Sequence, residues 1–113
     1  MAIETISKDN ALANRLIDKF RDKTAVIGVV GLGYVGLPLA VENSKAGYNV
    51  IGFDVDEEKV KKINQGSNYI GDVNDKELAE VVSDNKLMAT SDYSLIRNVD
   101  AIVMCVPTPL DIH

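Results

Sequence analysis

The chain has 113 residues, of which 46% are hydrophobic and 26% are charged, and its formal net charge is −5 at pH 7. This length allows one domain with a core of its own. The acidic balance, without any cluster of Lys and Arg, argues against nucleic acid or an anionic membrane as partner. The sequence shows neither a transmembrane run nor a signal peptide, and its single cysteine, Cys105, excludes an internal disulfide. We therefore expect a cytoplasmic protein.

The first predicted element is a helix that begins at Asp9 or Asn10 and ends near Arg21. Apolar residues recur on one narrow face of this helix: Leu12, Leu16, Ile17 and Phe20. We expect residues 1–23 to form a helical extension that packs against the domain or against a subunit partner. Nothing in this segment indicates a site of chemistry.

An apolar, β-branched run at 26–30 comes next, breaks into glycines and resumes as an apolar helix at about 34–46. Gly31, Gly33 and Gly36 have the spacing G-x-G-x-x-G. The first glycine allows a sharp turn, the second allows backbone to approach a pyrophosphate, and the third allows close packing of helix on strand. The phosphates would lie on N–H groups at the helix N-terminus. The alternative is a glycine-rich turn that binds nothing.

A second strand at 49–53 ends at Asp54, about 20 residues after the glycines, where an acid meets the ribose hydroxyls of a dinucleotide. An Asp54 carboxylate in this role favours NAD over NADP, because a 2′-phosphate would place like charge against it. The alternative role for Asp54 is a helix cap. Lys59 lies one turn beyond Asp56 and either reaches the same ribose or a phosphate, or is only solvated.

The remaining elements are predicted as helices at 56–66, 75–83 and 92–97 and strands at 87–90 and 101–106. The long polar connection at 67–74 is of a kind that is often functional. Alternation of strands and helices predicts an α/β fold, a Rossmann-like doubly wound parallel sheet of strand order 3-2-1-4. The last strand, which we expect in the core, contains Cys105 as a small buried hydrophobe and leads to Thr108. Thr108 stands between two prolines and either presents its hydroxyl to the cofactor or belongs to a rigid loop.

Three motifs in this order resemble the amino-terminal domain of the UDP-glucose/GDP-mannose dehydrogenase family. They are G-L-G-Y-V-G-L-P at 31–38, G-F-D-V-D at 52–56 with Lys59, and C-V-P-T-P-L at 105–110. The resemblance covers about residues 24–110. Within the family, S-N-Y-I-G-D-V at 67–73 is similar to the UDP-N-acetylhexosamine 6-dehydrogenases that act on the mannosamine or glucosamine sugar. UDP-glucose dehydrogenases usually carry a segment of the type P-I-x-E-P-G-L there.

The resemblance implies an oxidoreductase that converts the C6 alcohol of a UDP-sugar to a carboxylate in two NAD-dependent steps. The family's catalytic cysteine lies in a downstream glycine-rich motif that this sequence lacks, and Cys105 does not take its role. The domain that binds UDP is also absent from these residues. We expect no catalytic residue and no metal ligand here. The expected cofactor-binding residues are Gly31, Gly33, Tyr34, Val35, Gly36, Asp54, Lys59 and Thr108.

Residues 24–113 are accordingly predicted to form an NAD-binding Rossmann domain that is a fragment of a longer, homo-oligomeric enzyme. Its UDP-sugar substrate would be bound through C-terminal domains outside this sequence. A UDP-glucose 6-dehydrogenase, or a stand-alone NAD-responsive binding or regulatory domain, is the alternative. A last strand without its neighbour, and without charged residues, would leave an apolar sheet edge.

Overall fold

A computed structural model describes residues 3–71 and 73–105, with side chains from residue 11 onward. Its elements, in chain order, are α1 (Ile3–Asp22), β1 (Val26–Val30), α2 (Gly36–Lys45), β2 (Asn49–Phe53), α3 (Glu57–Asn64), α4 (Asp75–Ser83), β3 (Leu87–Thr90), a 3₁₀ helix η1 (Tyr93–Asn98) and β4 (Ala101–Met104). The predicted strands and helices of the domain are therefore present, with small differences in their ends.

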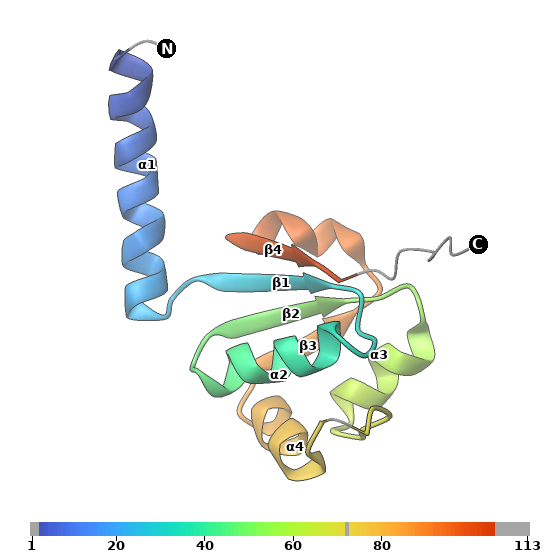
Figure 1. The fold of residues 1–113 in the computed structure, drawn as a ribbon. Helices are drawn as coiled ribbons and strands as arrows, with labels where there is room; N and C mark the ends of the chain where they lie inside the picture. The colour runs from blue at the N-terminus through green and yellow to red at the C-terminus, as the bar shows by residue number, and fades with distance from the viewer. Residues whose placement is uncertain (1–2, 72, 106–113) are drawn as a thin grey trace, which may run out of the picture.

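The four strands form one parallel sheet of order β3-β2-β1-β4, which confirms the predicted topology (Figure 1). The strand order reverses between β1 and β4, because β2 and β3 extend to one side of β1 and β4 lies on the other. In such sheets ligands bind beyond the carboxyl ends of the strands at this switch point. The turn after β1 lies at that edge of the sheet.

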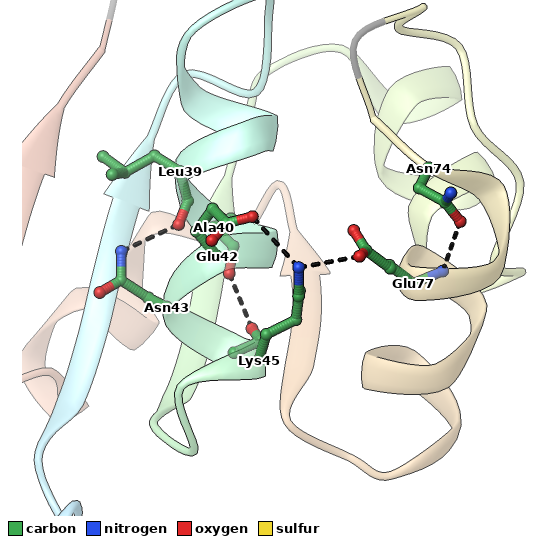
Figure 2. A network of polar contacts seen from close by, with 8 residues as sticks. Leu39, Ala40, Glu42, Asn43, Lys45, Asn74 and Glu77 are labelled. Atoms are coloured by element: carbon green, nitrogen blue, oxygen red, sulfur yellow. Dashed lines mark hydrogen bonds and ion pairs between the residues drawn. The ribbon is translucent and has the colours of Figure 1, made fainter.

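Helices α2, α3 and α4 cover one face of the sheet, and the core lies beneath them (Figure 1). Its fully buried large side chains are Leu32, Leu37, Ile63, Leu78 and Val29. An ion-pair group joins two of these helices: the Lys45 ammonium lies 3.3 Å from Glu42 and 2.8 Å from Glu77, so that α2 is tied to α4 (Figure 2). The Glu77 carboxylate is the largest cause of a raised pKa for Lys45.

The opposite face of the sheet is covered more thinly, by η1 and the residue that follows it. The Tyr93 ring of η1 packs against Phe53 with centroids 5.5 Å apart, and Val99 packs over Gly28. Beyond this contact β4 is open: Ile102 is 47% exposed and Met104 is 64% exposed. The prediction of a core strand at 101–106 is therefore wrong for its described part, because among the described residues β4 pairs only with β1 and η1 leaves Ile102 and Met104 exposed.

The helix α1 begins earlier than predicted, at Ile3 rather than at Asp9 or Asn10, and it extends away from the sheet (Figure 1). Among the side chains described from residue 11 onward, the last turn of α1 contacts the domain: the Phe20 ring packs edge-on against Tyr48 at 5.9 Å. Leu12 remains 55% exposed, so the apolar face packs against the domain at Phe20 and not along its length, and the alternative of a subunit partner stays a prediction. No helix in the described part of the chain has the length and apolar character needed to cross a membrane.

Candidate functional site

The turn from β1 to α2 is built so that two of its glycines cannot carry a side chain. Gly31 has φ of 94°, in the left-handed region that favours glycine. A Cβ on Gly36 would lie 1.6 Å from the carbonyl oxygen of Gly31, which no real contact allows. The absence of side chains at these two positions therefore allows α2 to pack closely on the end of β1, as the spacing predicts.

The middle glycine of the turn faces open space. A Cβ on Gly33 would meet no described atom within 4 Å. The first helical hydrogen bond of the turn is donated by the N–H of Leu37 to the Gly33 carbonyl, at 3.1 Å. The N–H groups of Tyr34, Val35 and Gly36 precede that bond and so have no intrahelical acceptor. The side chains of Tyr34 and Val35 are exposed, and the N-cap Val35 provides no side-chain acceptor.

Asp54 is buried and joins the end of β2 to this turn. One carboxylate oxygen, Oδ2, accepts a hydrogen bond from the N–H of Leu32 at 2.9 Å, and Oδ1 accepts one from Asp56 at 2.9 Å. The N-cap of α3 is Asp56, whose side chain accepts from the N–H groups of Glu58 and Lys59. Asp54 is therefore not the cap of α3. A carboxylate has about four lone-pair positions, and these two hydrogen bonds occupy two of them.

Tyr69 and Lys59 extend the same site toward α3. The Tyr69 hydroxyl donates to the Leu32 carbonyl at 2.6 Å, and its ring lies 6.0 Å from the Lys59 ammonium. Burial, together with the negative charges of Asp54 and Asp56, raises the pKa of Tyr69. Its hydroxyl is thus a protonated donor at neutral pH.

Sequence reasoning singled out the 67–74 connection but did not assign Tyr69 a contact. The available signal was an aromatic residue in a polar loop that follows the same edge of the sheet as Asp54. The hydroxyl of Tyr69 donates to a backbone carbonyl 37 residues earlier, and no sequence pattern indicates which carbonyl will accept such a bond.

The structure describes one of the two residues singled out in the motif at 105–110, Cys105, but not the other, Thr108. Thr108 lies outside the described residues, so its placement beside the turn stays a prediction. Cys105 follows β4 directly and is half-buried, with its N–H donated to the Val30 carbonyl at 2.7 Å. The expectation of a fully buried cysteine within the strand is wrong, because β4 ends at Met104 and its outer face is uncovered. Among the described residues no three His, Cys, Asp or Glu side chains form a metal-binding group.

Comparison with known proteins assigns this domain. Residues 25–113 match the NAD binding domain of the UDP-glucose/GDP-mannose dehydrogenase family. The UDP-N-acetyl-D-mannosamine dehydrogenase of Pyrococcus horikoshii is 41% identical over 85 residues, which are 74% of this chain and 20% of that protein. A UDP-N-acetyl-D-glucosamine 6-dehydrogenase of Pseudomonas aeruginosa is 37% identical over 91 residues, 80% of this chain and 21% of the relative.

The fold agrees with a solved relative. The structure of a UDP-D-ManNAc dehydrogenase from Pyrococcus horikoshii superposes with a TM-score of 0.70 at 40% identity, covering 76% of this chain and 21% of that one. The chain thus spans about a fifth of the length of the relatives it matches. The parallel sheet with its order β3-β2-β1-β4 agrees with these matches. The chain belongs to the UDP-glucose/GDP-mannose dehydrogenase family, and its residues 25–113 correspond to the NAD-binding domain of that family.

Proposed function

We propose that this chain provides the NAD site of a nucleotide-sugar 6-dehydrogenase that oxidises the C6 alcohol of a UDP-N-acetylhexosamine to a carboxylate. The observation that carries the cofactor part is the direct bond from Leu32 N–H to Asp54. It joins the two halves of a dinucleotide site, the phosphate-binding turn and the ribose-binding acid, at one sheet edge. NAD, when bound, would accept the hydride, and the residues of this domain bind and orient the cofactor.

The residues of the turn fit the pyrophosphate. The open space at Gly33 gives room for an anion against the backbone, because a side chain there would occupy that room. The N–H groups of Tyr34, Val35 and Gly36, at the positive end of α2, donate to phosphate oxygens in this proposal. Gly31 and Gly36 shape the turn and make no contact through a side chain.

The adenosine end is assigned to Asp54 and Lys59. The lone-pair positions of the Asp54 carboxylate that are left by its two backbone hydrogen bonds accept from the ribose diol. Lys59, in the first turn of α3, reaches the same ribose or a phosphate. A 2′-phosphate would meet the charges of Asp54 and Asp56, which favours NAD over NADP. Thr108 is proposed to lie near the reacting end of the cofactor.

The substrate class is proposed from the segment at 67–73 and from the names of the similar proteins. This segment resembles that of the UDP-N-acetylhexosamine dehydrogenases, and two relatives with this specificity match over most of the chain. The catalytic thiol, the acid/base groups and the UDP site are proposed to lie outside these 113 residues. Cys105 is an unsuitable nucleophile, since it packs against the apolar core.

Three measurements test this function. Calorimetric titration of the 113-residue chain should show binding of NAD and weaker binding of NADP, and NADH absorbance should show no turnover of any UDP-sugar by the chain alone. The complete enzyme is assayed with UDP-N-acetylmannosamine, UDP-N-acetylglucosamine and UDP-glucose. Highest turnover of UDP-glucose would overturn the substrate class, and turnover by the isolated chain would overturn the placement of the catalytic groups.

A further inference from the structure

Two side chains from different segments hold the backbone of Leu32. Its N–H donates to Asp54 at the end of β2, at 2.9 Å, and its carbonyl accepts from the hydroxyl of Tyr69, at 2.6 Å. The side chain of Leu32 is fully buried and packs directly over Gly52, where an added Cβ would lie 2.8 Å from it. Leu32 is thus fixed at its side chain and at both peptide groups.

We propose that Tyr69 is a positioning residue of the cofactor site, which orients the N–H of Gly33 through the peptide that links Leu32 to Gly33. This inference rests on the proposed NAD site. The Leu32 carbonyl and the Gly33 N–H belong to one planar trans peptide and point in opposite directions. A hydroxyl that holds this carbonyl therefore also sets the direction of that N–H.

Gly33 makes such a support necessary. Glycine can occupy a wide range of φ and ψ, so the peptide before it can rotate at low cost when nothing holds it. Nothing described lies near the Cα substituent position of Gly33 to restrict it. The Tyr69 hydroxyl is the described side-chain group that holds the carbonyl of this peptide.

Tyr69 also contacts the opposite part of the site. Its ring lies 6.0 Å from the Lys59 ammonium, within the range of a cation–π interaction. One residue from the 67–74 connection therefore touches the turn after β1 and the first turns of α3. If Tyr69 only stabilised the fold, its substitution would lower the free energy of unfolding and leave the affinity of the folded protein for NAD unchanged. A positioning role would lower that affinity as well, so the two roles can be separated by measuring both quantities.

The chain contains a matched control for Tyr69. The hydroxyl of Tyr48 donates to the Phe20 carbonyl at 2.8 Å, and the Lys23 ammonium lies 5.0 Å from its ring. Tyr48 precedes β2, at the amino edge of the sheet and away from the turn after β1. Tyr69→Phe and Tyr48→Phe thus remove the same kind of hydrogen bond, one at the proposed site and one remote from it.

The test measures NAD affinity by calorimetry and the free energy of unfolding in urea for both variants. We expect Tyr69→Phe to weaken NAD binding about three- to tenfold, the effect of one lost hydrogen bond, and Tyr48→Phe to change it less than twofold. Tyr69→Leu, which also removes the ring beside Lys59, should weaken binding further. Wild-type affinity in Tyr69→Phe, or an equal loss in both phenylalanine variants, would overturn the inference.

A second readout does not depend on the cofactor. In ¹H–¹⁵N spectra of the free protein, Tyr69→Phe should shift or broaden the Gly33 amide resonance, whereas Tyr48→Phe should leave it in place. An unchanged Gly33 resonance in Tyr69→Phe would overturn the positioning role. If the wild-type protein failed to bind NAD, the proposed function would be overturned, and the Gly33 amide would still show whether Tyr69 orients that peptide.

Discussion

The backbone N–H of Leu32 and the carboxylate of Asp54 are joined by a hydrogen bond of 2.9 Å between residues 22 positions apart. The bond places the acid against the turn that it serves, since the carboxyl ends of parallel β1 and β2 lie side by side. Asp54 therefore has two effects that can be measured separately. It stabilises the turn in the free protein, and in the proposed NAD site it offers its remaining lone-pair positions to the ribose.

Substitution of Asp54 should affect cofactor choice. We expect Asp54→Ala to weaken NAD binding by about 1–3 kcal/mol, because charge-assisted hydrogen bonds to the ribose are lost, and to narrow the preference over NADP. Asn74→Ala is the control: it removes the cap of α4 at a cost of about 1 kcal/mol in stability and should alter NAD affinity little. Calorimetric titration of each variant with both cofactors checks this. NADP binding as tight as that of NAD by the wild type would contradict the assignment of Asp54.

Substitution of Gly33 should affect NAD binding and leave the fold intact, whereas substitution of Gly36 should destabilise the fold. Gly33→Val places a side chain in open space, so the unfolding free energy should change by less than about 1 kcal/mol while NAD binding is abolished. Gly36→Ala would force a Cβ to 1.6 Å from the Gly31 carbonyl and should destabilise the fold by at least about 3 kcal/mol. Urea unfolding and NAD titration of both variants distinguish these effects. Normal NAD binding by Gly33→Val would show that the turn does not hold the pyrophosphate.

Elements that depend on residues close together in the sequence could be predicted, whereas contacts between residues far apart in the sequence could not. Strands β1 and β2 and helix α4 have the predicted limits, because apolar spacing and caps such as Asn74 are local signals. The sheet order and the place of Asp54 follow from general rules of parallel sheets. The hydrogen bond of Tyr69 could not be predicted, since its acceptor is a distant carbonyl.

The start of α1 and the exposure of β4 were mispredicted for a related reason. Asp9 and Asn10 are typical N-cap residues, but such a residue begins a helix only where the residues before it are not helical, and α1 already starts at Ile3. An apolar sequence in β4 indicates a surface that is suited to burial. It does not show that anything in the same 113 residues covers that surface, and Ile102 and Met104 are exposed.

Acid should loosen the junction between α1 and the sheet. The backbone N–H of Val26 and the Lys19 ammonium lie 2.8 and 2.9 Å from the Asp100 carboxylate, and they hold the pKa of Asp100 below its ordinary value of 3.8. A carboxyl with a lowered folded pKa stabilises the fold above the unfolded value, and this stabilisation is lost as pH falls through the folded pKa.

The measurement is an NMR titration of the Asp100 carboxyl carbon. Lys19→Ala should raise this pKa toward its ordinary value without restoring it, because the Val26 donor is the larger cause. The pKa of Asp92, lowered by Ser94, should stay unchanged in the same variant and serves as the control. An Asp100 pKa at or above 3.8 in the wild type would contradict the role of this junction.

The 113-residue chain alone should self-associate through the open side of β4. Parallel register places Met88, Ile51, Gly28 and Ile102 in one row on the sheet face opposite α2, and this face carries exposed apolar side chains. The edge of β4 has a strand neighbour only on the β1 side within the described residues, and its apolar residues include no charge that would oppose pairing.

Ile102→Lys should therefore shift the chain toward the monomer in size-exclusion chromatography with light scattering, because a charge on a strand edge discourages pairing with another chain. Leu12→Lys is the matched comparison, since Leu12 is similarly exposed at 55% but belongs to α1, the helix that extends away from the sheet (Figure 1). We expect Leu12→Lys to associate as the wild type does. A wild-type chain that stays monomeric at high concentration would contradict the argument, and loss of association in Leu12→Lys alone would place the contact on α1 instead of β4.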